Sequence, residues 1–143
     1  RALMSLRLEK NWGAWTLDFR PDFTAAESGL DIFINWNKDF VGKEASLNEK
    51  KQGIKKKLVT MIIDTKDIDV TNDEAILKDD KCVGYVTSGG YAHHIKKSIA
   101  LGYVPVKLSK HETSLDVEIN GNLYKAHVTD RPLYDANGGK MKS

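Results

Sequence analysis

The stretch from Cys82 to Val106 contains side chains that could do chemistry: a Thr-Ser-Gly-Gly run, two adjacent histidines and two adjacent lysines. A phosphate-binding loop needs a glycine-rich turn of fixed spacing between a strand and a helix. The run 87–90 lacks the Walker spacing and its lysine, and a strand-like sequence follows it. We therefore expect a strand that ends in a tight turn, where Gly89 and Gly90 supply unusual φ angles.

The two adjacent histidines, His93 and His94, are candidate metal ligands by type. Neighbouring residues point to opposite faces of a strand and diverge by about 100° on a helix, so this pair cannot chelate one ion. No spacing connects the pair to His111 or His127. The pattern therefore favours surface histidines, and we assign no metal site.

Trp12, Trp15 and Phe19 are crowded into a segment that also contains Gly13 and Arg20. Aromatic side chains on a loop can wall a pocket for a flat ligand, or they can cover a core. Both interpretations stay open on the residues alone. No Ser/His/Asp or Cys/His set and no carboxylate pair with diagnostic spacing is present, so we assign no catalytic residue.

The 143 residues fit one domain, or one domain plus a piece of another. A net charge of +2 gives no prior for a nucleic-acid partner, and the lysine runs 55–57 and 96–97 are typical of solvated strand edges. The single cysteine, Cys82, excludes an internal disulfide framework and suits a reducing compartment. No apolar run approaches the roughly 20 residues of a membrane span. The chain begins at Arg1, inside an expected helix, which indicates a fragment of something longer.

The first part of the chain has helical signals. Residues 2–10 are apolar-rich without Gly or Pro and are predicted to form a helix, followed by an irregular connection over 11–23. Thr24-Ala-Ala-Glu27 has the form of a capping box, and the apolar residues after it fall on one helical face, which predicts a second helix. A short polar helix is expected over 44–51, stopped by Gly53.

From Ile54 onward the pattern changes to that of β-strands. The candidate strands are "KKLVTMIID", "KCVGYVTS", "SIALGYVPV" and "SLDVEINGNLYKAHV". Asn120-Gly121 divides the last of these, and Asn-Gly can take positive φ at both turn positions, so it predicts a hairpin. Short strands at close spacing predict a small barrel or sandwich, and the boundary between the two parts falls near residues 42–54.

Six motifs occur in the order found in one known family. They are "SLRLEK" followed by Trp12, "TAAESGL", "DFVGKEA", "VGYVTSGGY", "KSIALGYVPV" and "RPLYD". Together they resemble the dimethylglycine and sarcosine dehydrogenase family, and they are shared with aminomethyltransferases, including the T-protein of glycine cleavage. The resemblance covers nearly the whole chain, and "SLRLEK" and "DIDVTNDEAI" lean toward the dimethylglycine dehydrogenase branch.

The resemblance implies an α+β chain in two parts. Residues 1–45 would be the C-terminal end of a folate-binding aminomethyltransferase domain, and residues 46–143 its antiparallel β-barrel domain. The parent would be a tetrahydrofolate-dependent one-carbon transfer protein, with FAD only if an upstream flavin domain exists. The implied partner is the upstream folate-binding half of the parent, and the implied compartment is bacterial cytoplasm or the mitochondrial matrix. Residues 2–40 would expose apolar surface that the missing part covers.

The resemblance also implies the site residues. The family's catalytic aspartate, and the Tyr and Glu that hold the pterin, match nothing in this chain, so the chain alone should not be catalytic. The expected folate-binding residues are Trp12, Trp15, Arg1 and Lys140. Trp12 matches a family aromatic residue that lies beside folate, and Trp15 matches the aromatic residue of a "WG" motif. Arg1 is placed as in the sarcosine branch, and Lys140 is expected near the folate tail. The alternative is a non-enzymatic regulatory relative of the same fold, which loss of the upstream aspartate and glutamate would indicate.

Overall fold

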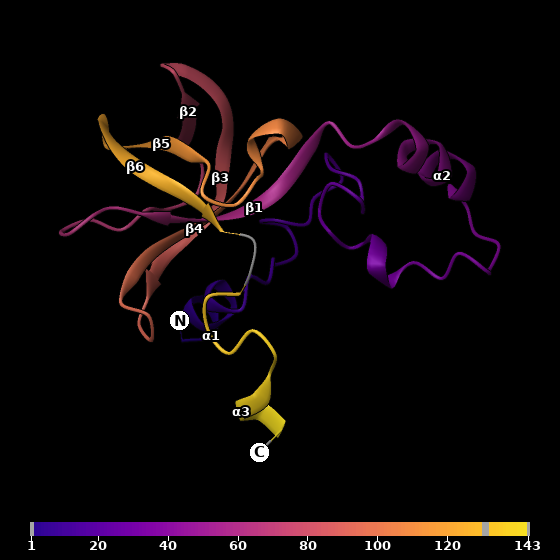
Figure 1. Ribbon diagram of the computed structural model, residues 1–143, viewed down its shortest axis with the longest axis horizontal. Coiled ribbons are helices and arrows are strands. Elements are labelled where there is room, and N and C mark those ends of the chain that lie inside the picture. The colour runs from indigo at the N-terminus through magenta and orange to yellow at the C-terminus, as the bar shows by residue number, and fades with distance from the viewer. Residues whose placement is uncertain (1, 130–131, 143) are drawn as a thin grey trace.

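The computed structural model describes residues 2–129 and 132–142, and it places helical segments outside a closed β-barrel (Figure 1). The elements in chain order are α1 Ala2–Glu9, η1 Asp31–Phe33, α2 Lys43–Gln52, β1 Lys56–Ile63, β2 Ala75–Lys78, β3 Lys81–Ala92, β4 Lys97–Pro105, η2 Val106–Leu108, β5 Ser114–Ile119, β6 Asn122–Thr129 and α3 Gly139–Lys142. Within the described ranges, no helix is long and apolar enough to cross a membrane.

The six strands close into a barrel in the order β1-β4-β3-β2-β5-β6, and every pairing is antiparallel. β1 pairs with both β4 and β6, which closes the barrel and removes the exposed edges that an open sheet would have. The predicted Asn120-Gly121 hairpin joins β5 to β6, with φ angles of 49° and 80° at the two turn residues. The α+β prediction with a small antiparallel barrel is therefore confirmed.

The turn predicted at Gly89-Gly90 is wrong. β3 continues through both glycines to Ala92, and the turn into β4 follows over residues 93–96. At Gly89 the requirement is space, because a Cβ there would lie 2.6 Å from the carbonyl oxygen of Val70. Close backbone approach, and not a reversal of the chain, accounts for this glycine.

One strand of the barrel was missing from the sequence analysis. β2 is four residues long and joins β3 through Asp79 and Asp80, whose φ angles of 51° and 59° are both left-handed. Asp tolerates this conformation better than most residues, so Asp-Asp forms the tight turn here without glycine.

The apolar residues form two clusters, on opposite faces of the barrel wall. The interior is filled by a cluster that includes Met61, Ile76 and Val117. A second cluster, which includes Leu8, Ile99 and Leu101, lies between α1 and the outer face of the barrel. β4 alternates between the two clusters, so it is buried on both faces, and α1 is part of the folded unit around it.

Two helix predictions are confirmed and one is wrong. α1 and α2 form where expected, and α2 ends at Gly53 with φ 85°. The capping box of Thr24 and Glu27 also forms, with reciprocal hydrogen bonds of 3.1 and 3.3 Å. A helix does not follow, because the carbonyl of Glu27 accepts from the amide of Leu58 at the start of the barrel and Gly29 turns to φ 71°. Between this turn and α2, the described helical structure is the three-residue η1.

Residues 29–55, here called the arm, extend away from the barrel and carry α2 at their far end (Figure 1). None of residues 20–58, all of which the structure describes, is buried. The arm nevertheless contains large apolar side chains, among them Ile32 and Phe33, which are 77% and 65% exposed. Exposed apolar side chains gathered on one segment are typical of an interaction surface.

Gly84 on β3 offers a test of the barrel packing. A Cβ at this position would overlap the backbone carbonyl of Tyr103 on β4. Gly84→Ala should therefore lower the free energy of unfolding by about 3 kcal/mol or prevent folding, as overpacked cores do. Gly139→Ala is the matched control, since its Cβ would meet only Asp135 Oδ1 at 3.7 Å. Urea denaturation followed by circular dichroism measures both, and equal stability of the two variants would contradict this packing.

Candidate functional site

The loop of residues 11–23 carries the aromatic residues singled out from the sequence, between α1 and the arm. Trp12 makes edge contacts with Phe19 and Phe33, each with 6.1 Å between ring centroids, and Trp15 contacts Phe19 at 5.8 Å. We call these four residues the aromatic cluster. Phe19 is buried, whereas Trp12 and Trp15 are 51% and 78% exposed. The cluster therefore presents two indole rings to the outside on a buried phenylalanine.

A hollow of about 430 Å³ lies beside the aromatic cluster. It is lined by Trp15, Thr16, Phe19, Arg20, Pro21, Phe23, Thr24, Ala25, Ser28 and Leu30. Most of the lining residues are apolar. Arg20 is the one positively charged residue among them. Such a volume, with aromatic walls and few polar groups, is typical of a pocket for a small flat molecule.

A buried carboxylate, Asp18, holds the loop to the barrel. Its side chain is fully buried and forms an ion pair with Arg7 of α1 at 2.6 Å. Asp18 Oδ2 also accepts from the amide of Ala14 at 2.7 Å and from the hydroxyl of Ser88 on β3 at 2.9 Å. Thr87 on β3 donates to Oδ1. These donors satisfy a charge that would otherwise be costly to bury.

Tyr103 on β4 makes a second connection between the loop and the barrel. Its hydroxyl donates to the backbone carbonyl of Asp18 at 2.9 Å and lies 2.7 Å from the hydroxyl of Ser28. Its ring stacks on Phe23 with 3.4 Å between centroids. Desolvation by burial raises the pKa of Tyr103 to about 12, although the hydrogen bond with Ser28 acts in the opposite direction.

The C-terminal segment is fastened to α1, and it contains the predicted tail-binding residue Lys140. The carbonyl of Glu9 accepts from the amides of Leu133 and Tyr134, at 3.0 and 3.1 Å. One contact of Lys140 is a cation–π contact: its ammonium lies over the ring of Tyr134, 5.0 Å from the ring centroid. The hydrogen bond from Lys10 is the main reason that the pKa of the neighbouring Asp135 is lowered.

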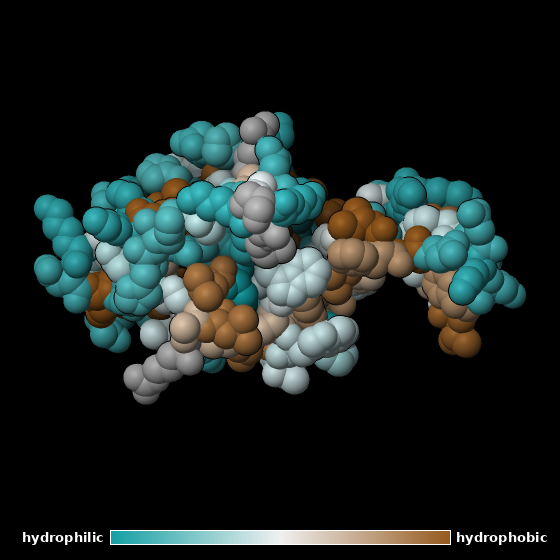
Figure 2. Space-filling model, turned by 90° about the horizontal axis from the view of Figure 1, so that it is seen from below, coloured by the Kyte–Doolittle hydropathy of each residue, from teal (hydrophilic) through white to brown (hydrophobic). Residues whose placement is uncertain are grey.

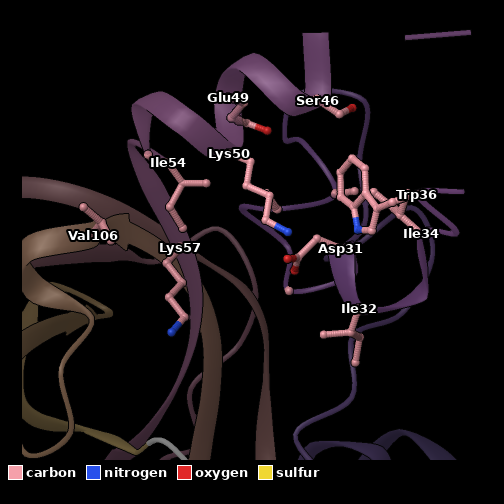
Figure 3. Close-up of a pocket in the computed structure, with 14 residues that line it drawn as sticks. Asp31, Ile32, Ile34, Trp36, Ser46, Glu49, Lys50, Ile54, Lys57 and Val106 are labelled. Carbon is pink, nitrogen blue, oxygen red and sulfur yellow. The ribbon is translucent and has the colours of Figure 1, made fainter. Parts of the chain in front are cut away.

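A second hollow, of about 460 Å³, lies between the arm and the start of β1 (Figure 3). Figure 3 shows Lys50 extending from α2 toward Asp31, with Trp36 and Ile32 beside them. The ammonium of Lys50 lies 5.0 Å from the centroid of the Trp36 ring, a cation–π contact. This hollow was not predicted from the sequence, because its lining comes from residues 25–57 together with Val106.

The structure brings together some of the predicted site residues. Trp12 and Trp15 both contact Phe19, and their role in a folate site stays a prediction. Lys140 lies on the C-terminal segment, and Arg1 lies outside the described residues. The sequence analysis missed Asp18, because nothing in the sequence distinguishes it from Asp22, the other carboxylate in the aromatic-rich segment 12–23.

The predicted surface histidines are confirmed. His93 and His94 are exposed at the turn between β3 and β4, and the ring of His94 packs on Tyr134 at 3.7 Å. Within the described part of the chain, no three His, Cys, Asp or Glu side chains gather in a way that could hold a metal ion.

Comparison with known families and proteins gives a consistent result. The family described as "Glycine cleavage T-protein C-terminal barrel domain" matches residues 56–135. Human mitochondrial dimethylglycine dehydrogenase is 41% identical over 134 residues, which are 92% of this chain and 16% of that protein. An aminomethyltransferase of Picosynechococcus sp. is 35% identical over 135 residues, which are 93% of this chain and 37% of that protein.

A solved structure has the same fold. The glycine cleavage system aminomethyltransferase T from Bartonella henselae superposes with a TM-score of 0.88 and 26% identity, over 94% of this chain and 38% of that one. The chain therefore spans less than two fifths of the length of each of these relatives.

The raised pKa of Tyr103 predicts a loss of stability in alkali. The unfolded tyrosine ionises near pH 10 and the folded one near pH 12, so its contribution is complete below pH 10 and is lost as the pH rises toward 12. From about pH 9 to about pH 11, the free energy of unfolding of the native chain should fall by about 1 kcal/mol more than that of Tyr103→Phe. Urea titrations at each pH measure this difference, and parallel pH profiles would refute it.

Proposed function

The chain belongs to the family of the glycine cleavage T-protein C-terminal barrel domain, and from this premise we propose that it completes and braces a tetrahydrofolate site. The parent activity would be folate-dependent one-carbon transfer, of the dimethylglycine or sarcosine dehydrogenase kind or the aminomethyltransferase kind. The observation that carries the proposal is the aromatic cluster: the exposed rings of Trp12 and Trp15 both contact the buried Phe19, and Trp15 and Phe19 line an apolar hollow.

The chemistry of the cluster suits the cofactor. Tetrahydrofolate has flat ring systems, and flat rings pack well on indole faces and edges. When bound, it supplies the amine that accepts the one-carbon unit. Trp12 and Trp15 would form the wall, and the basic residues proposed for the carboxylate tail are Lys140 and, by resemblance, Arg1. Carboxylates of a glutamyl tail would form charge-assisted hydrogen bonds with such groups.

The role of this chain would be orientation. A wall that fixes the folate rings lets their amine meet the carbon donor in one geometry, and correct placement alone accelerates a two-reactant step strongly. We place the proton-handling and pterin-holding groups in an upstream folate-binding half, since the family's residues for these roles match nothing here. FAD enters only if a flavin domain precedes that half. The division at residues 45 and 46 is part of this proposal.

The exposed apolar surface supports an upstream partner within the same protein. α1 presents Leu3, Met4 and Leu6, which are 75%, 43% and 55% exposed. Figure 2 shows apolar groups on this side of the barrel and on the arm. The relatives are all much longer than this chain, so a folate-binding half of the same protein is the partner that fits. The compartment would be the mitochondrial matrix or a bacterial cytoplasm.

Trp12 provides the test of the folate wall. In the chain joined to its upstream half, Trp12→Ala should weaken tetrahydrofolate binding by about tenfold, because a stacking face is lost. Trp36→Ala is the control, since it removes the same ring from the hollow under the arm and should change the affinity by less than about twofold. Isothermal titration calorimetry measures both dissociation constants. Equal effects of the two substitutions, or no effect of Trp12→Ala, would contradict the proposed wall.

A further inference from the structure

We propose that Asp18 is a positioning residue that sets the orientation of the aromatic cluster on the barrel. This inference rests on the proposed function for its biological meaning, but its structural content can be tested without any ligand. Asp18 is fully buried and is not among the residues that line the hollow beside the aromatic cluster. Its influence would act through the two tryptophans.

Each tryptophan is connected to Asp18 by a short path. The Nη1 of Arg7, which pairs with Asp18, also donates to the carbonyl of Trp12 at 3.3 Å. Trp15 lies inside the turn that Asp18 closes, where Asp18 Oδ2 accepts from the amide of Ala14 and the Asp18 amide donates back to the Ala14 carbonyl at 2.9 Å. One carboxylate therefore fixes the backbone at both indole rings.

An irregularity in β3 lets the barrel reach Asp18 with two hydroxyls. Adjacent residues of a regular strand point to opposite faces. The pairing of β3 with β4 shifts between Val86 and Ser88, which leaves Thr87 unpaired in the register. At such a bulge the side chains are re-aimed, and here both Thr87 and Ser88 donate to the carboxylate of Asp18. The irregularity in β3 thus brings two neighbouring hydroxyls to one carboxylate, and the Thr87 hydroxyl also lies 3.2 Å from the carbonyl oxygen of Leu101.

The loop is so closely packed that a small displacement of Asp18 would also displace the rings of the aromatic cluster. A Cβ on Gly13 would lie 2.5 Å from the ring of Phe19, so the loop has no space to spare on this side. The barrel interior, by contrast, is filled by strand residues and by Val70, and Asp18 is not among them. Removal of the Asp18 charge should therefore disturb the aromatic cluster and leave the barrel folded.

Fluorine NMR of the chain labelled with 5-fluorotryptophan tests this directly, since there are three tryptophans. Asp18→Asn removes the counter-charge of buried Arg7, so the Trp12 and Trp15 resonances should shift or broaden while that of Trp36 stays in place. Asp22→Asn is the matched control: it removes a carboxylate of the same loop that is 58% exposed and pairs with Arg20. All three resonances should be unchanged in this control.

Ser88→Ala is the second variant and removes one donor to the carboxylate. It should shift the same two resonances by a smaller amount, which keeps the test decisive if Asp18→Asn does not fold. Unchanged Trp12 and Trp15 resonances in a folded Asp18→Asn chain would overturn the proposal. A collapse of all three resonances in both variants would also overturn it, because the role of Asp18 would then be only structural.

Ligand affinity separates this inference from the proposed function. In the chain joined to its upstream half, Asp18→Asn should weaken tetrahydrofolate binding about as much as Trp12→Ala does, by about tenfold. If the native protein binds and Asp18→Asn binds equally well, the positioning role fails. If the native protein does not bind but Asp18→Asn shifts the two resonances, the positioning role stands and the folate proposal fails.

Discussion

The buried ion pair of Arg7 and Asp18 is the interaction on which the arrangement of this chain depends. Breaking a buried pair by removing one partner costs about 3–5 kcal/mol, because the other charge is left uncompensated. Here the pair joins α1, the loop of residues 11–23 and β3, which are far apart in sequence. Without the Asp18 carboxylate, the loop that carries Trp12 and Trp15 would lose its hydrogen bonds to β3 and keep the connection to Tyr103 on β4. The stacking of Phe23 on Tyr103 and the fastening of the C-terminal segment at Glu9 extend the same attachment around the barrel wall.

The barrel and the arm differ in how many buried contacts hold them. The barrel is closed and filled, and its wall is covered on one side by α1. The arm has no buried residue among residues 29–55, so hydrogen bonds and partly exposed contacts are all that fix it. This difference agrees with a barrel that folds as a unit and an arm whose apolar side chains face the remainder of a longer protein. In that arrangement the aromatic cluster would lie at the boundary between the two parts.

Local signals predicted local structure, and contacts distant in sequence escaped prediction. The Asn120-Gly121 hairpin and the end of α2 at Gly53 were foreseen, because each depends on the φ angles of one or two residues. The capping box of Thr24 and Glu27 formed its own hydrogen bonds, but a helix did not follow, because the start of β1 competes for the Glu27 carbonyl. The crowding of Trp12, Trp15 and Phe19 pointed to one cluster, and the folate-binding role that the family resemblance adds for the two tryptophans stays a prediction. Asp18 was missed because its partner Ser88 is 70 residues away.

Native-state hydrogen exchange of the unmodified chain tests the central claim most directly. If the ion pair joins the loop to the barrel, the amides of Trp12, Asp18 and Phe19, which donate to carbonyls of α1 and of the loop, should exchange about as slowly as those of β4. The amides of α2 in the arm should exchange much faster. Loop amides that exchange as fast as those of α2, while β4 stays protected, would show that the barrel does not hold the aromatic cluster.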